Sequence, residues 1–88
     1  MDFEWDDWKA RANIKKHKVA FDRAMRVFLD PAIYDLEDDD IYDEDRLVAI
    51  GMVDHQILVV IYTMRGATCR IISARRAEPH EKRWYHEG

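Results

Sequence analysis

Three arginines in the second half of the chain have the residue type and spacing to bind an oxyanion. Arg65, Arg70 and Arg75 lie in or beside segments that we expect to form neighbouring strands. A guanidinium stays charged, and its planar fork binds two phosphate oxygens at once. One concave sheet surface can gather all three. However, strand alternation places Arg70 and Arg75 on one face only if the chain bends near Ser73-Ala74. The alternative for each arginine is a surface ion pair.

A second group of candidates combines an imidazole, an amine and a carboxylate. His17 can take up or release a proton near neutral pH, and Lys16 beside it can bind a phosphate. Both also suit the end of a helix, where cations complement the negative end of the helix dipole. Glu44 can act as a carboxylate base beside Arg46, and the alternative for this pair is a salt bridge at the entrance of a strand.

Aromatic and histidine side chains near the C-terminus add further candidates. Tyr85 can stack on a planar base, but Trp84 lies beside it, so we expect one of the two to pack on the core. His80 and His86 lie in the same stretch and match no pattern that assigns them a role.

Other kinds of site find no support in the sequence. The four histidines show no i, i+4 pair, and a single cysteine excludes a disulfide framework or a cysteine-based zinc site. No glycine-rich phosphate loop occurs, and Ser73, the single serine, has no nucleophile-elbow context. We therefore expect no metal and no cofactor, and we expect Cys69 to lie in the core.

The charge of the chain is unevenly distributed. The net charge is −4, but the segment from Asp35 to Asp45 holds eight acids and no base. The rest of the chain carries a net charge of +4. Seven bases face one acid from Lys9 to Arg26, and six face two from Arg65 to Arg83. The chain is thus a basic body with an acidic loop, although ordinary solvated surfaces would produce the same pattern.

The length of 88 residues predicts a single domain over residues 1–88. The longest apolar run, from Ile57 to Tyr62, is far below the roughly 20 residues that a membrane span requires. The acidic N-terminus has no apolar signal segment. We therefore expect a cytoplasmic protein without a membrane partner.

The hydrophobic pattern predicts an α+β domain in which two N-terminal helices pack on an antiparallel β-sheet and a short helix ends the chain. Asp6 is the expected N-cap of the first helix, and a stripe of Phe21, Ala24, Met25 and Phe28 is expected to bury one face of the second. The expected helices are Asp7 to His17, Ala20 to Leu29 and Pro79 to Tyr85, and the expected strands are Phe3 to Trp5, Ala32 to Leu36, Arg46 to Val53, Gln56 to Thr63 and Thr68 to Ala74.

Several sequence fragments occur in a familiar order and spacing. They are Phe3-Glu4-Trp5-Asp6, Asn13-Ile14-Lys15-Lys16-His17, Phe21 to Phe28 ending in Asp30-Pro31, Glu44-Asp45-Arg46, Ile50-Gly51, Leu58-Val59-Val60, Thr63, Arg65-Gly66, Arg70 to Ala77, Glu81 and Tyr85. From Phe3 to Tyr85 the chain strongly resembles the BrnT family of ribonuclease toxins from bacterial type II toxin–antitoxin modules. Lys18 stands where that family usually has glycine.

The resemblance implies a RelE-like fold, metal-independent cleavage of RNA, growth inhibition and neutralisation by a BrnA-type antitoxin. It also implies that the chain reaches DNA only through the antitoxin complex. The candidate catalytic residues are then His17, Glu44, Arg65, Arg70 and Arg75, and the candidate RNA-binding residues are Lys16, Arg46 and Tyr85. Two alternatives remain, a non-catalytic interaction domain that keeps the fold and a small DNA-binding regulator.

Overall fold

The computed structural model describes residues 1–37 and 46–88 and confirms the predicted α+β class and order of elements. The elements are β1 (Asp2–Glu4), α1 (Asp7–His17), α2 (Phe21–Ala24), the 3-10 helix η1 (Met25–Leu29), β2 (Tyr34–Glu37), β3 (Leu47–Val53), β4 (Gln56–Arg65), β5 (Thr68–Arg76) and α3 (Pro79–Glu87). Among these described elements, no helix has the length and apolar character to cross a membrane.

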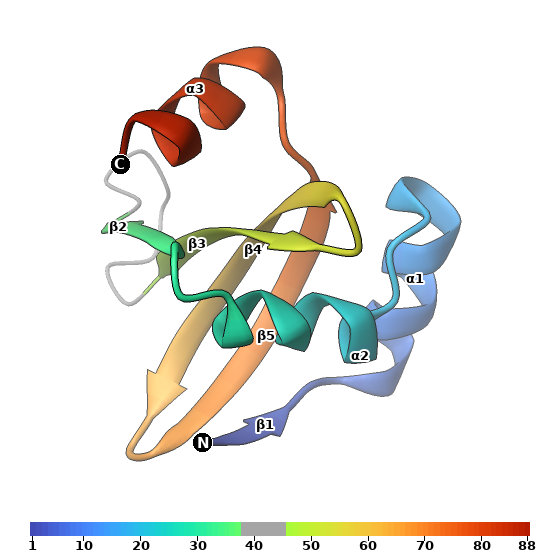
Figure 1. The fold of residues 1–88 in the computed structure, drawn as a ribbon. Coiled ribbons are helices and arrows are strands. Elements are labelled where there is room, and N and C mark those ends of the chain that lie inside the picture. The colour runs from blue at the N-terminus through green and yellow to red at the C-terminus, as the bar shows by residue number, and fades with distance from the viewer. Residues whose placement is uncertain (38–45) are drawn as a thin grey trace.

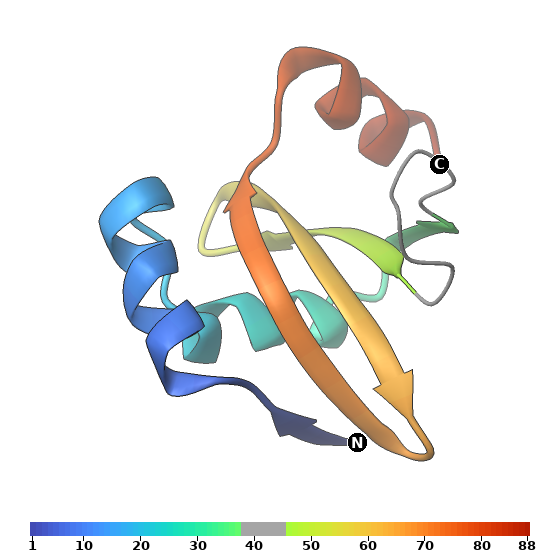
Figure 2. The same ribbon diagram turned by 180° about the vertical axis from the view of Figure 1, so that it is seen from behind.

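Five strands form one sheet in the order β1-β5-β4-β3-β2 (Figure 1). The strands β2 to β5 form the predicted antiparallel meander, but β1 runs parallel to β5, so the sheet is mixed and not antiparallel throughout. The helices carry the chain from one edge of the sheet to the other and reverse its direction. After the three reversals of the meander, β5 therefore runs in the same direction as β1 and lies beside it (Figure 2).

The larger hydrophobic core lies between the sheet and the helical region that precedes β2. Phe21, Ala24 and Val27 pack there against inward-facing residues of β3, β4 and β5. Cys69 is fully buried in this core, as predicted, and burial raises the pKa of its thiol to about 11. The first helices therefore shield this face of the sheet from solvent.

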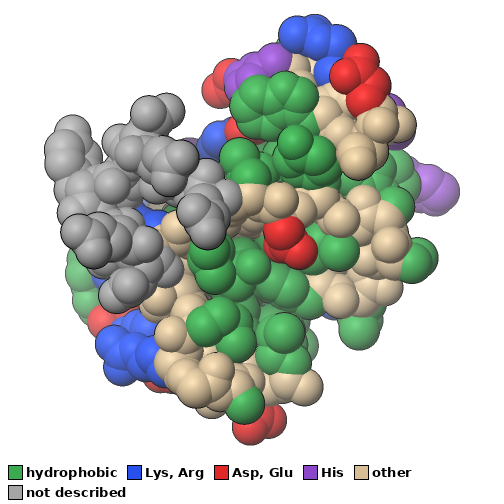
Figure 3. All heavy atoms as spheres, turned by 90° about the vertical axis from the view of Figure 1, so that its left-hand side faces the viewer, with side chains coloured by type: hydrophobic (Ala, Val, Ile, Leu, Met, Phe, Trp, Pro, Cys, Tyr) green, Lys and Arg blue, Asp and Glu red, His purple; other side chains and the backbone are tan. Residues whose placement is uncertain are grey.

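A smaller core lies on the opposite face of the sheet, beneath α3. Its buried members are Val48, Ile50, Ile57, Val59 and Ala77. Tyr85 of α3 packs against it from above. Figure 3 views the molecule from the side of β2 and α3, and hydrophobic side chains gather between these two elements. The helix α3 therefore covers only one end of this second face.

The predicted stripe on the second helix is corrected by the structure. A 3.6-residue period places Met25 and Phe28 on the buried face with Phe21 and Ala24. The chain instead tightens into η1 at Met25, and the three-residue period of a 3-10 helix turns Val27 inward. Val27 is fully buried, whereas Met25 and Phe28 are half-buried at the margin of the larger core.

The helix η1 lies very close to β3 at Gly51. A Cβ atom at this position would lie 2.7 Å from Cγ1 of Val27. Such a contact would force η1 away from the sheet, so glycine is needed there to let the two backbones approach.

Both ends of α1 are capped. The Asp6 carboxylate accepts a hydrogen bond from the Trp8 N–H at 3.2 Å, which confirms the predicted N-cap. At the other end Lys18 has φ 62° and ψ 27°, and its N–H donates to the Ile14 carbonyl at 2.9 Å. A side chain at Cβ is unfavourable in this left-handed conformation, which glycine adopts freely.

We predict that Lys18→Gly stabilises the protein by about 0.5–1 kcal/mol, because it removes the cost of the left-handed conformation at the end of α1. Urea unfolding monitored by circular dichroism measures this change. Lys15→Gly, in the same helical turn, is the matched control and should destabilise by about 1 kcal/mol. Equal destabilisation by both variants would contradict the prediction.

Candidate functional site

Arg70 and Arg75 lie on the same face of the sheet because β5 carries one extra residue between them. The register against β4 shifts between Ile61 and Tyr62, which leaves Ile72 without a cross-strand partner. Side chains alternate along a strand, and an inserted residue shifts that alternation by one. The bend that the alternation requires is therefore present, and both arginines face away from the larger core.

The same face also carries Arg65 and Arg46. Arg70 pairs with Thr63 of β4, and Arg65 follows two residues later on the same side of that strand. Arg46 directly precedes β3. Leu47 pairs with Tyr62 of β4, so extending this register by one residue places Arg46 beside Thr63. Arg65 is exposed and Arg46 is half-buried. Four of the predicted site residues thus share one face, across β3, β4 and β5.

Arg70 is held by an ion pair with β1. Its Nη1 atom donates to Glu4 Oε2 at 2.8 Å, and the two residues are paired in the parallel register of β1 and β5. The side chains are 25% and 38% exposed, so water screens the pair and its contribution to stability is small. The pair orients the guanidinium and leaves it accessible.

Arg75 is held more firmly, by a buried carboxylate of α3. Its Nη1 and Nη2 atoms donate to the two oxygens of Glu81 at 2.7 and 2.8 Å. Glu81 Oε1 also accepts a hydrogen bond from the Glu78 N–H at 2.8 Å. Burial opposes the ionisation of Glu81, but these hydrogen bonds outweigh it and lower the pKa of the carboxyl. The hydrogen bonds to Glu81 likewise raise the pKa of Arg75.

Lys16 and His17 lie in the last turn of α1, at a different place from the arginines. Both line a hollow between α1 and β5 that also includes Ile72 and Ser73. Lys16 is exposed and His17 is half-buried. In the part of the chain that the structure describes, no hydrogen bond joins His17 to an arginine. The hollow extends to Ile72, the extra residue of β5, which is the strand that carries both Arg70 and Arg75.

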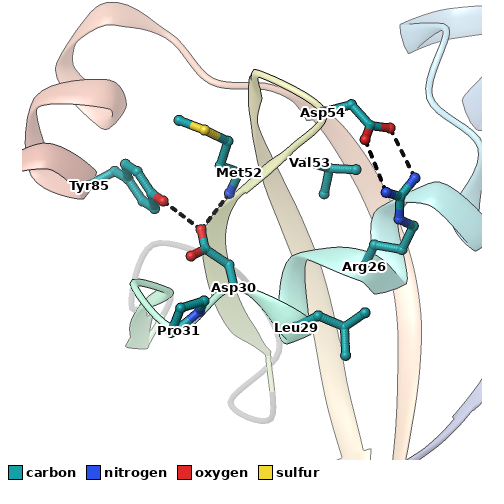
Figure 4. A pocket seen from close by; sticks show the side chains of 8 residues that line it. All are labelled: Arg26, Leu29, Asp30, Pro31, Met52, Val53, Asp54 and Tyr85. Atoms are coloured by element: carbon teal, nitrogen blue, oxygen red, sulfur yellow. Dashed lines mark hydrogen bonds and ion pairs between the residues drawn. The ribbon is translucent and has the colours of Figure 1, made fainter.

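Tyr85 is anchored by its hydroxyl. The hydroxyl donates to Asp30 Oδ2 at 2.5 Å, and the Met52 N–H donates to the same oxygen at 2.7 Å (Figure 4). The hydrogen bond to Asp30 raises the pKa of Tyr85 to about 12. Partial burial opposes ionisation of Asp30, yet its hydrogen bonds lower the pKa of that carboxyl. Tyr85 rather than Trp84 packs on the core, and Trp84 is 41% exposed.

The hollow drawn in Figure 4 has a volume of about 340 Å³ and is bounded by η1, the end of β3 and α3. On the side away from Tyr85, Arg26 forms two hydrogen bonds with Asp54, at 2.9 and 3.0 Å. This bidentate pair is exposed, and Arg26 belongs to η1, which packs on the opposite face of the sheet from Arg70 and Arg75.

Glu44, the predicted carboxylate base, lies outside the described residues. Within residues 1–37 and 46–88, no group of three or more His, Cys, Asp or Glu side chains is arranged to hold a metal ion.

A comparison with known protein families shows which family the chain belongs to. The family model described as "Ribonuclease toxin, BrnT, of type II toxin-antitoxin system" matches residues 5–81. The chain belongs to the BrnT family. This confirms the resemblance found in the sequence, and the matched range includes Arg65, Arg70, Arg75 and Glu81. No curated protein matches the chain. As a BrnT toxin, the chain is a ribonuclease toxin with an antitoxin partner.

Four polar residues that orient the arginines or join the surrounding elements were not predicted from the sequence. Glu4 and Glu81 orient arginines, Asp30 anchors α3, and Asn13 joins α1 to β5 through its buried amide. Two of them carried a usable signal. Glu81 follows Glu78 at the spacing of a capping box, and Asp30 precedes a proline at the end of a helix.

We predict that Glu81→Gln destabilises this BrnT protein by about 1–3 kcal/mol at pH 7, because Arg75 loses its charged partner. Because the folded-state pKa of Glu81 lies below its ordinary value of 4.5, the wild-type pair stabilises above that pH. This stabilisation is lost as the pH falls from 4.5 through the lowered pKa, so the difference between the two proteins should shrink.

Urea unfolding at pH 7 and pH 3 measures this difference. Glu87→Gln, an exposed acid on the same helix, is the matched control and should leave stability unchanged at both pH values. A difference between wild type and Glu81→Gln that grows on acidification would contradict the assignment.

Proposed function

We propose that this BrnT toxin is a metal-independent endoribonuclease of the cytoplasm that inhibits growth and is neutralised by a BrnA-type antitoxin. The observation that carries the proposal is the gathering of Arg46, Arg65, Arg70 and Arg75 on one sheet face. Packing of the helical region on the other face supports the RelE-like fold that the resemblance implies.

Cleavage of RNA without a metal uses the 2′-hydroxyl of the substrate as the nucleophile. The reaction needs a base for that hydroxyl, an acid for the leaving 5′-oxygen, and cations around the pentacoordinate phosphate. Arg65, Arg70 and Arg75 supply the cations. Ion pairs with Glu4 and Glu81 hold two of these guanidinium groups in place before RNA arrives, which lowers the cost of ordering them in the transition state.

The other predicted residues complete the proposal. His17 and Glu44 are the candidates for proton transfer, without an assignment of acid and base. Lys16, Arg46 and Tyr85 are proposed to bind RNA. The contacts of Tyr85 restrict how it can do so, because its hydroxyl is occupied by Asp30 and only the exposed part of its ring is available.

A second candidate function is a non-catalytic interaction domain. The observation that favours it is that Arg70 and Arg75 already have carboxylate partners, which a phosphate would have to displace or share. A domain that uses this face only to bind a partner protein would keep the same ion pairs. The two candidates differ in whether the purified chain cleaves RNA.

We predict that the purified chain cleaves RNA in EDTA and that Arg70→Ala lowers the rate about 30- to 1000-fold. A contact made mainly in the transition state contributes about 2–4 kcal/mol, which corresponds to this range. Arg70→Lys should recover part of the rate, since it restores a charge without the planar fork. The measurement is single-turnover cleavage of a labelled RNA.

Arg26→Ala is the matched control, because Arg26 is an exposed, ion-paired arginine away from this face. It should cleave like the wild type. On expression without the antitoxin, growth arrest should be strongest for the wild type and Arg26→Ala, weaker for Arg70→Lys and weakest for Arg70→Ala. A wild-type chain that cleaves no RNA would establish the interaction domain instead, and full activity of Arg70→Ala would remove Arg70 from the mechanism.

The charge map leads to a further prediction about the antitoxin. Nonspecific DNA binding comes mainly from Lys and Arg that release phosphate counterions, and a net charge of −4 with an eight-acid segment opposes it. In a gel-shift titration at about 150 mM salt, the chain alone should leave the module's promoter unbound, whereas the antitoxin complex should bind it. Tight specific binding by the chain alone would support the regulator instead.

A further inference from the structure

A shallow hollow between α1 and β5 combines an exposed aromatic ring with a small apolar surface. It has a volume of about 240 Å³, and Trp8, Ala12 and Ile72 supply its apolar part. Trp8 is 60% exposed, although tryptophan residues usually bury most of their surface. The hollow therefore presents a large planar ring to solvent beside other apolar groups.

The polar groups around the hollow are basic or neutral. Lys9, Lys16 and His17 line it from α1, and Ser73 lines it from β5. The helix α1 as a whole carries Lys9, Arg11, Lys15 and Lys16 against the single acid Asp7. A ligand that offers a planar apolar ring and negative charge complements this surface, whereas an acid-poor, apolar peptide would leave the lysines unpaired.

The base of the hollow is rigid. Asn13 lines it, and the Asn13 amide is fully engaged by the backbone. Its Nδ2 donates to the carbonyls of Val19 and Ala74 at 2.8 and 2.9 Å, and its Oδ1 accepts from the Ala74 N–H at 3.1 Å. The amide has no donor left for a ligand, so recognition falls to Trp8, Ser73 and the lysines.

The hollow adjoins the arginine-bearing face along β5. Ser73 lines the hollow and pairs with Ile61, which places Ser73 on the same strand face as Arg70 and Arg75. Arg75 is two residues beyond Ser73, or about 7 Å along the strand. A chain held by its phosphate at Arg75 can therefore place a neighbouring group in the hollow. Figure 2 shows α1 lying alongside β5 in this region.

We propose that this hollow is a subsite for one base of a single-stranded RNA, next to the nucleotide whose phosphate lies at the arginines. The base stacks on the Trp8 indole, Ser73 contacts its edge, and Lys9 and Lys16 bind flanking phosphates. This inference rests on the proposed RNA substrate. It adds a group that positions the RNA by stacking, and stacking tolerates any base because every base has a π-face.

The test uses a 2′-O-methyl RNA oligonucleotide, which cannot be cleaved because the nucleophile is blocked, and measures its Kd by fluorescence anisotropy. Trp8→Ala should weaken binding about 5- to 150-fold, the factor that stacking of one base on an aromatic side chain contributes. Trp8→Phe should recover most of the affinity. The slope of log Kd against log salt should stay unchanged in Trp8→Ala and fall by about 0.7 in Lys16→Ala, which loses one phosphate contact.

Trp84→Ala is the matched control, since Trp84 is another exposed indole but lies on α3 outside the hollow. It should bind like the wild type, and unchanged melting temperatures should show that both variants are folded. Wild-type affinity in Trp8→Ala, or an equal loss in Trp84→Ala, would overturn the subsite. If Trp8→Ala instead loses affinity for the antitoxin and none for RNA, the hollow is a protein-docking surface and the proposal is wrong.

The same oligonucleotide separates this inference from the proposed function. A wild-type chain that binds it through Trp8 but fails to cleave the unmodified RNA would refute the ribonuclease mechanism and support the subsite. A chain that cleaves RNA with a rate and affinity independent of Trp8 would support the mechanism and refute the subsite.

Discussion

Both faces of the sheet depend on the one extra residue that β5 carries at Ile72. If strict alternation continued from Cys69 and Ile71, Ala74 would leave the helix-covered core and Arg75 would enter it. The Asn13 amide fastens the strand directly after this irregularity, through hydrogen bonds to the N–H and the carbonyl of Ala74. The bulge and this clamp together keep a small apolar residue inside the protein and the following guanidinium outside it.

The arginine-bearing face is divided into two parts with different tasks. Its apolar part lies beneath α3, and its polar part lies towards β1. Arg75 lies at the end of the face that α3 covers, since its cross-strand partner Val59 belongs to the apolar part and its ion-pair partner Glu81 holds α3 in place. Among residues 1–37 and 46–88, Arg70 forms an ion pair only with Glu4 of the short strand β1. A change at Arg75 therefore alters both the charge of the face and the attachment of a helix, whereas a change at Arg70 acts mainly on the charge.

The sequence predicted the elements better than the directions of their side chains. Apolar periodicity is repeated along most elements, so the order of helices and strands could be inferred from it together with the Asp6 cap of α1. The bulge left no such trace, because the extra residue Ile72 is apolar like Ile71 before it and does not interrupt the strand pattern. The change from α2 to η1 was hidden for the same reason, since Val27 and Phe28 are equally plausible core residues. Asn13 was missed because α1 has a weak apolar stripe, on which a polar residue resembles surface.

The pairing of β1 with β5 has a consequence for the timing of folding. Residues 2–4 pair with residues 68–70, and the ion pair between Glu4 and Arg70 spans 66 positions. Closing so long a loop costs more chain entropy than closing any hairpin of the meander, and non-local contacts of this kind slow folding. During synthesis β1 is made long before β5 and has no strand to join until residues 68–70 follow it. The orientation of Arg70 is thus tied to contacts that form late, so a nascent chain does not yet present the arginine arrangement of the finished protein.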